Sequence, residues 1–133
     1  MHMKEITIVV DTDSVAAGDD IFSHQVEIVI PVSRSVKELV DVAKEKCPLA
    51  SIKGGKATWF VYAGIGNWVN IAVLAQQWES PQFLIDQTIE VKNLFTGIEK
   101  SVTFKYWCQA SPNAVYDALK SNTELPDRYS NKV

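Results

Sequence analysis

A change of hydrophobic period within the first 47 residues constrains the fold of this 133-residue chain most strongly. Residues 5–11 and 25–31 alternate apolar and polar side chains, which is typical of β-strands with one buried face. Residues 35–47 instead space their apolar side chains three and four positions apart, which predicts an α-helix with one apolar stripe. That stripe comprises Val36, Leu39, Val40, Ala43 and Cys47. We therefore expect two antiparallel strands followed by a long helix.

Both expected helices begin at recognisable capping residues. Ser35 and Glu38 have the spacing of a capping box, in which each side chain accepts a hydrogen bond from the other residue's backbone N–H. Ser111 followed by Pro112 predicts the start of a second, shorter helix. The residues after this helix, 122–133, are polar and are expected to form a loose tail.

Four further segments have the composition of strands. They are residues 57–63, 68–78, 88–93 and 101–107, and the last two are expected to pair as a hairpin. The predicted order is thus strand, strand, helix, four strands, helix. We expect one α+β domain over residues 1–133, with a mostly antiparallel sheet of five to six strands, one long helix and one short helix.

The first half of this order resembles the β-grasp arrangement of the ubiquitin-like type. The resemblance is carried by the succession of hairpin, helix and strand and by SVKELV at the start of the helix. It covers about half of the chain and implies a way of packing, because a shared fold does not determine an activity.

The sequence GIGN at residues 64–67 allows either a phosphate-binding loop or a turn. A dinucleotide fingerprint needs a third glycine and a helix that starts at the loop, but position 69 is Val and the next segment is strand-like. Glycines that supply positive φ between two antiparallel strands account for the pattern. We therefore expect a hairpin turn.

Composition and charge exclude several classes of protein. The net charge is −3 and no Lys/Arg cluster occurs, which argues against nucleic-acid binding. No apolar run approaches the length of a membrane helix, and we expect no signal peptide and a cytoplasmic location. Cys47 and Cys108 lack metal-ligand spacing, so we expect two reduced thiols and no metal or cofactor.

An acidic segment joins the first two strands. Asp11, Asp13, Asp19 and Asp20 lie within ten residues, but an EF-hand reading fails at the positions that require glycine and glutamate. The segment is interpreted as a solvated loop, or as a docking loop for a basic partner. His24 follows it and can be a surface residue or the polar group of a pocket.

Four tryptophans are many for this length. Trp68, Trp78 and Trp107 fall on strand faces that also carry polar side chains, which is typical of a binding surface. Trp59, Tyr62 and His24 are candidates for lining a pocket, and the alternative is that the aromatic residues form the core.

The sequence favours a non-catalytic protein that binds another, basic protein. One specific form is an immunity-type or antitoxin-like inhibitor. Two alternatives stay open: a small-molecule binder or small enzyme with a tryptophan-walled pocket on the sheet, and a structural subunit or homodimer that assembles through sheet edges.

Overall fold

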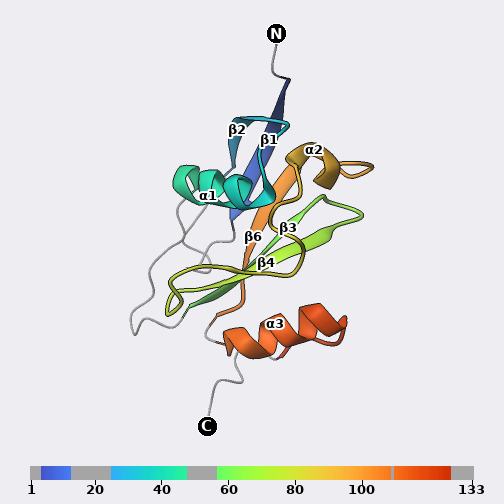
Figure 1. Ribbon diagram of the computed structural model, residues 1–133. Coiled ribbons are helices and arrows are strands. Elements are labelled where there is room, and N and C mark those ends of the chain that lie inside the picture. The colour runs from blue at the N-terminus through green and yellow to red at the C-terminus, as the bar shows by residue number, and fades with distance from the viewer. Residues whose placement is uncertain (1–3, 13–24, 48–56, 109, 127–133) are drawn as a thin grey trace.

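Three helices and a six-stranded sheet form the fold in the computed structural model, which describes residues 4–12, 25–47, 57–108 and 110–126 (Figure 1). The strands are β1 (Glu5–Thr12), β2 (Val26–Pro31), β3 (Thr58–Ala63), β4 (Val69–Ala75), β5 (Gln82–Phe83) and β6 (Ser101–Tyr106). The helices are α1 (Val36–Lys46), α2 (Val91–Leu94) and α3 (Pro112–Ser121). Their order in the chain confirms an α+β protein.

The sheet is mixed, with the strand order β2-β1-β6-β3-β4-β5. Strands β1 and β2 pair antiparallel, as predicted, and so do β3 and β4. The expectation of a mostly antiparallel sheet is only partly met, because β6 lies between β1 and β3 and pairs parallel with β1. This parallel pairing joins the first and the last strand of the chain, so no local sequence pattern indicates it.

The predicted strand at residues 88–93 is wrong, and so is the hairpin it was expected to form with residues 101–107. Val91–Leu94 is the short helix α2. Val91 and Leu94 are three positions apart, so one turn of helix buries both. Before the helix, Glu90 forms a bridge with Ser35, and the Val36 N–H donates to the Ile89 carbonyl oxygen at 2.8 Å.

The two predicted helix starts are confirmed. The Glu38 N–H donates to the Ser35 Oγ at 3.2 Å, and the Ser35 N–H donates to the Glu38 carboxylate at 3.3 Å. The Ala114 N–H donates to the Ser111 Oγ at 3.3 Å, with Pro112 in the first turn of α3. Each side chain thereby satisfies a backbone donor that the first turn leaves without a partner.

One face of the sheet packs against α1 and α2. The predicted apolar stripe of α1 is buried there, together with the inward residues of β1 and β2. Large side chains from the middle strands complete this core, among them Phe104, Ile71 and Val61. The main hydrophobic core therefore lies between α1 and the sheet.

The other face of the sheet is partly covered by a helix and partly exposed to solvent. Helix α3 lies on the opposite side of the sheet from α1 (Figure 1) and packs over β4. Phe60 and Val73 are buried beneath it, with Val115 of the helix itself. On β1 and β2 the same face carries exposed Glu5, Thr7 and Glu27, which is the alternation of a sheet with one solvated side.

The first residues after α3 contact the rest of the fold. Asn122 ends the helix in the left-handed conformation, and the Thr123 N–H donates to the Ala118 carbonyl oxygen at 2.8 Å. The Trp107 indole N–H donates to the Pro126 carbonyl oxygen at 2.8 Å. Residues 122–126 of the expected tail thus lie against the α3 side of the sheet, and residues 127–133 are outside the described part of the chain.

Candidate functional site

The tip of the β3–β4 hairpin is formed by the GIGN sequence, which makes a turn. Gly64 has a φ of +93°, a conformation that favours glycine. A Cβ atom added there would collide with the Asn67 carbonyl oxygen. Gly66 has no positive φ, and a Cβ atom at that position would meet no atom within 4 Å. Gly64 is therefore required by the turn, whereas Gly66 is not.

A carboxylate from the α2–β6 connection fixes this tip. The Ile65 N–H donates to the Glu99 carboxylate at 3.1 Å. Hydrogen bonds from the backbone N–H groups of Glu99 itself, Ile65 and Gly66 lower the pKa of the Glu99 carboxyl. The Gly64 N–H also donates to the Ser101 carbonyl oxygen at 3.0 Å. The tip is thus tied to a distant segment through both its backbone and this carboxylate.

The fixed tip exposes large apolar side chains. Ile65 is 65% exposed and Trp68 is 60% exposed. The Trp68 ring lies beside the Tyr62 ring, with centroids 5.7 Å apart and planes tilted by 48°. We call Tyr62, Ile65 and Trp68 the hairpin corner. Exposed apolar side chains on a hydrogen-bonded turn are an arrangement suited to contact with another molecule.

A β-bulge places an amide beside the hairpin corner. Val61 pairs with Ala72, but the next pair is Tyr62 with Asn70, so Ile71 is the extra residue on β4. The bulge brings the Asn70 side chain opposite Tyr62. The Asn70 Oδ1 atom is buried and accepts no hydrogen bond from any residue that the structure describes. An amide oxygen in this state costs about 1–3 kcal/mol relative to a satisfied one.

A hollow of 450 Å³ opens between the hairpin corner and α3. Phe60, Tyr62 and Trp68 line its sheet side, together with Asn70 and Lys105. Leu119, Thr123 and Leu125 line its other side. The hollow therefore combines aromatic and aliphatic walls with a few polar groups, which is the composition of many ligand sites.

A second hollow, of 540 Å³, lies on the other side of Tyr62. It runs over β1 and β6, where Val9, Ser101 and Thr103 contribute, and it reaches Ile65 and Glu99 of the tip. The Ser101 Oγ atom is buried and has no hydrogen-bond partner among the described residues. The hairpin corner thus stands between two depressions of the same face.

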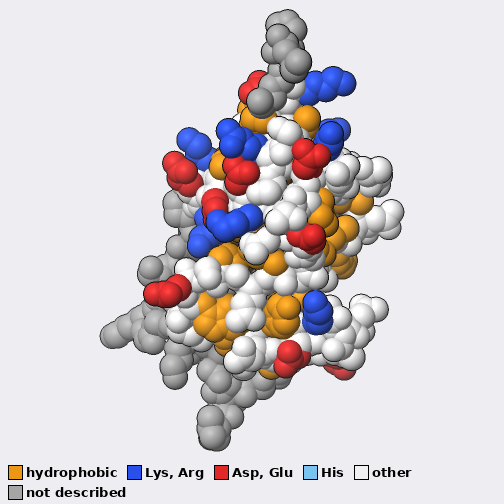
Figure 2. All heavy atoms as spheres, in the orientation of Figure 1, with side chains coloured by type: hydrophobic (Ala, Val, Ile, Leu, Met, Phe, Trp, Pro, Cys, Tyr) orange, Lys and Arg blue, Asp and Glu red, His pale blue; other side chains and the backbone are white. Residues whose placement is uncertain are grey.

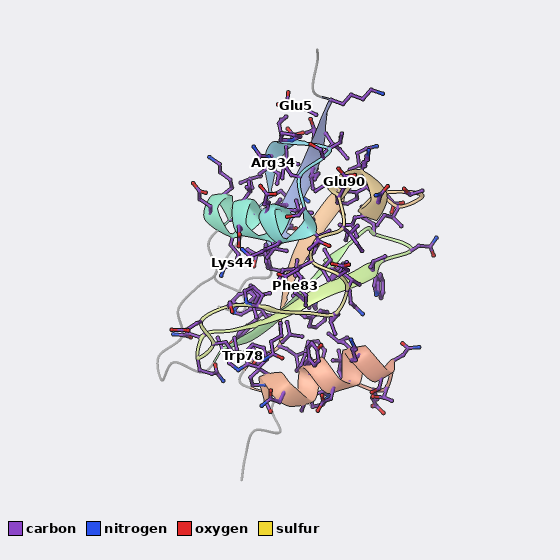
Figure 3. The ribbon with its side chains drawn as sticks, in the orientation of Figure 1. Glu5, Arg34, Lys44, Trp78, Phe83 and Glu90 are labelled. Atoms are coloured by element: carbon purple, nitrogen blue, oxygen red, sulfur yellow. The ribbon has the colours of Figure 1, made fainter. Side chains whose placement is uncertain are left out.

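A third hollow, of 690 Å³, lies between α1 and the β4–β5 segment. Lys37, Asp41 and Lys44 of α1 line it, and Lys37 pairs with Asp41 at 3.1 Å. Figure 2 shows the charged side chains gathered over α1, and Figure 3 shows Lys44 and Phe83 in the region between α1 and α3. Hydrogen bonds from the Thr88 side chain and backbone lower the pKa of Asp86, which also lines this hollow. The side chains that line this hollow carry both positive and negative charges, so they favour neither anionic nor cationic ligands.

Of the four aspartates of the predicted acidic surface, the structure describes only Asp11. Asp11 is half-buried near the end of β1 and lines the second hollow. Asp13, Asp19, Asp20 and His24 lie outside the described residues.

The predicted aromatic residues separate onto different surfaces. Trp59 is 3% exposed in the α1-side core, with its ring 4.8 Å from that of Tyr106. Trp78 and Trp107 are partly buried beside α3 (Figure 3 shows Trp78 there), and the Trp107 ring lies 5.7 Å from that of Phe60. Trp68 is the exposed member of the hairpin corner. The structure brings Tyr62 and Trp68 together and places Trp59 on the opposite face.

The two cysteines are not joined by a disulfide. Cys47 is buried at the end of α1, and burial, followed by the negative charge of Asp11, raises the pKa of its thiol. Cys108 has a φ of +57°, and its carbonyl oxygen accepts a hydrogen bond from the Thr58 N–H at 2.9 Å. The raised pKa of Cys47 disfavours a reactive thiolate at that position.

Two features of the described residues concern metal and membrane binding. They contain no group of three or more His, Cys, Asp or Glu side chains placed to hold a metal ion. None of their helices has the length and apolar character needed to cross a bilayer.

No protein-family model matches this chain, and no curated protein matches it.

Four residues of the site were not anticipated from the sequence: Ile65, Glu99, Asn70 and Lys105. Ile65 had a usable signal, because a large apolar residue between two glycines of a turn has little chance of burial. Glu99 had none, since it reaches the hairpin from 34 positions away. Alternation over residues 68–78 placed Asn70 on the same face as Trp68, but its pairing with Tyr62 depends on the bulge.

Proposed function

We propose that this protein is a non-catalytic protein-binding domain that uses the hairpin corner as its main contact. The observation that supports this most is the exposure of Ile65 and Trp68, at 65% and 60%, on a turn tied down by Glu99. Rigid aromatic anchors contribute most to protein interfaces, because they bury a large area and lose little conformational entropy on binding.

The surroundings of the corner fit the same proposal. Protein interfaces have an apolar centre and a polar rim. Around Trp68 and Ile65 lie Glu99, Lys105 and Thr103, which are exposed or half-buried. The two hollows beside Tyr62 give the face a shape that a partner's side chains can fill.

A pair of matched substitutions tests the proposal. Trp68→Lys and Ile65→Lys remove exposed apolar side chains at the corner, whereas Val29→Lys removes one that is 58% exposed on β2. Tagged variants are used to capture partners from extract of the source cells, with circular dichroism as a check on folding. We expect a partner that is retained by the wild type and by Val29→Lys and lost from both corner variants. Equal loss from all three variants would contradict the proposal.

A more specific form is binding of a basic partner in the cytoplasm, as an immunity- or antitoxin-like inhibitor does. It is supported by the acidic sequence of residues 1–48, which contain nine acids and five bases, because complementary charge accelerates association. Replacing Asp11, Asp13, Asp19 and Asp20 by Asn is expected to lower the association rate and weaken its salt dependence. An unchanged rate and salt slope would remove the charge argument.

The 450 Å³ hollow supports a second candidate, a small-molecule-binding protein. Its volume and mixed lining lie in the usual range of ligand sites. Native mass spectrometry of protein purified under mild conditions would reveal a bound metabolite, and its loss in Leu119→Trp would locate it in this hollow.

The fold itself is interpreted as a β-grasp. The central order β2-β1-β6-β3-β4, with β1 parallel to β6 and α1 across one face, supports this classification. The classification implies no activity.

A further inference from the structure

We propose that β2 pairs with the β2 strand of a second copy of this chain, antiparallel and around a two-fold axis at Ile28. The sheet then continues from one copy into the other. This inference goes beyond the proposed function, because it concerns the sheet edge at β2, and β1, β6 and β3 separate that edge from β4 and the hairpin corner.

The two edges of the sheet differ in how they are protected. β5 and β2 are its terminal strands. β5 has two residues, and the Tyr116 hydroxyl of α3 donates to the Phe83 carbonyl oxygen at 3.2 Å. β2 has six residues, no lysine and no bulge in its register with β1. Because a long, regular edge strand presents a row of backbone donors and acceptors, the β2 edge is the one suited to pairing with another strand.

The β1–β2 ladder shows which backbone groups of β2 point outward. The Val32 N–H donates to the Lys4 carbonyl oxygen at 3.0 Å, in the register that pairs β1 with β2. Every second pair of an antiparallel ladder is hydrogen-bonded, so the backbone groups of Ile28 point towards β1 and those of Glu27 and Val29 point away from it. No hydrogen bond from the described residues of other segments reaches these outward groups. Each of the two residues therefore offers one N–H and one C=O for pairing.

Charge and proline select one register for a second copy. When Glu27 lies opposite Val29 of the other copy, each outward N–H meets an outward carbonyl oxygen. A shift in one direction places Glu27 opposite Glu27, and like charges directly opposite are destabilising. A shift in the other direction places Glu27 opposite Pro31, which has no N–H and whose carbonyl oxygen already accepts from the Arg34 N–H at 3.1 Å. The strand is thus self-complementary in a single register, as a two-fold interface requires.

The side chains fit this register as well. Glu27 is exposed and Val29 is 58% exposed on the solvated face of the sheet. Opposite each other, Val29 loses apolar exposure against the methylene groups of Glu27. One strand from each copy makes a small interface, so we expect a weak dimer that depends on concentration.

The first experiment is sedimentation equilibrium of the full chain at about 1 µM to 1 mM, a range that covers weak association. We expect the wild type to change from monomer to dimer within it. Val29→Pro removes an outward N–H and leaves the β1–β2 ladder intact, as circular dichroism checks, whereas Val29→Thr keeps that N–H in a β-branched residue. Two-fold symmetry removes the bond twice, so Val29→Pro should weaken the dimer about 5–150-fold and Val29→Thr should associate as the wild type does.

Two charge variants at the same position test the register. In Val29→Lys each new side chain lies opposite Glu27 of the other copy as an opposite charge, and in Val29→Glu it lies there as a like charge. We expect Val29→Lys to associate about 2–30-fold more tightly than the wild type and Val29→Glu about 2–30-fold more weakly, with both differences reduced by salt. These variants change only an exposed side chain, so they test the inference even if Val29→Pro does not fold.

The inference is overturned if the wild type stays monomeric over the whole range. It is also overturned if a folded Val29→Pro dimerises as tightly as the wild type, or if Val29→Lys and Val29→Glu associate equally. Trp68→Lys and Ile65→Lys should dimerise as the wild type does, and loss of the dimer in both would place the contact at the hairpin corner instead. Failure of the proposed function is read separately, from the capture of partners, in which Val29→Lys keeps the dimer.

Discussion

Replacing Gly64 by alanine tests whether the hairpin corner is held in one conformation. Gly64 has a φ of +93°, beyond the left-handed region that other residues visit. A non-glycine residue held in such a region costs about 1–3 kcal/mol. The added Cβ atom would also collide with the Asn67 carbonyl oxygen, which must shift. We therefore expect Gly64→Ala to lower the free energy of unfolding by about 2–4 kcal/mol.

Gly66→Ala is the matched control, two residues away in the same turn. The added Cβ atom meets nothing within 4 Å, and the backbone has no positive φ. Alanine reduces the conformational entropy of the unfolded chain, so this variant is expected to gain about 0.4–1 kcal/mol.

Urea unfolding followed by circular dichroism measures both variants. With a slope of about 2 kcal/mol per M, the midpoint of Gly64→Ala should fall by about 1–2 M and that of Gly66→Ala should rise slightly. Equal midpoints for the two variants would show that the turn tolerates a side chain at position 64. The rigid presentation of Trp68 would then be refuted.

Three further substitutions follow from contacts of the described residues. Hydrogen bonds lower the Glu99 pKa, so the carboxylate stabilises the folded state above the ordinary glutamate pKa, and this stabilisation is lost as the pH falls through the lowered value. Glu99→Gln should therefore flatten the dependence of the urea midpoint on pH below about pH 5. An unchanged profile would contradict the contact. Ser35→Ala removes one half of the α1 capping box and should lower the free energy of unfolding by about 1 kcal/mol, measured against exposed Ser33→Ala. Thr58→Val removes a buried hydroxyl that donates to the Ala110 carbonyl oxygen at 2.6 Å, so a loss of about 1–3 kcal/mol is expected, and a loss below 0.5 kcal/mol would show that the bond is dispensable.

Local sequence patterns predicted the elements whose stability depends on neighbouring residues. Helix α1 was anticipated from its stripe and from Ser35 and Glu38, because capping and amphipathic burial are settled within a few residues of each other. The β3–β4 hairpin was anticipated from GIGN, since a turn between two apolar strands needs glycine at a positive φ.

Non-local pairing limited the rest of the prediction. The segment TIEVKN alternates like a strand over six residues, but Val91 and Leu94 are also one helical turn apart. Six residues do not distinguish the two periods, and hydrogen bonds with the start of α1 favour the helix here. The placement of β6 beside β1 depends on contacts across some 90 residues, which no local pattern contains.

The candidate site was predicted only in part, because its geometry also depends on contacts between residues far apart in the sequence. Alternation over residues 68–78 put Trp68 and Trp78 on one face of a strand, but β4 ends at Ala75. Trp78 is partly buried in the cluster beside α3, whereas Trp68 is exposed. The pairing of Tyr62 with Asn70 depends on a bulge, and a single extra residue in a strand leaves no signature in composition.

Hydroxyl-radical footprinting of the tryptophans tests the central claim most directly. Oxidation of Trp68 is measured by mass spectrometry in the isolated chain and in its complex with the captured partner, with buried Trp59 as the internal reference. If the hairpin corner is the contact surface, oxidation of Trp68 falls strongly in the complex and that of Trp59 stays low in both samples. A Trp68 side chain that is oxidised equally in the isolated chain and in the complex would place the partner elsewhere and contradict the claim.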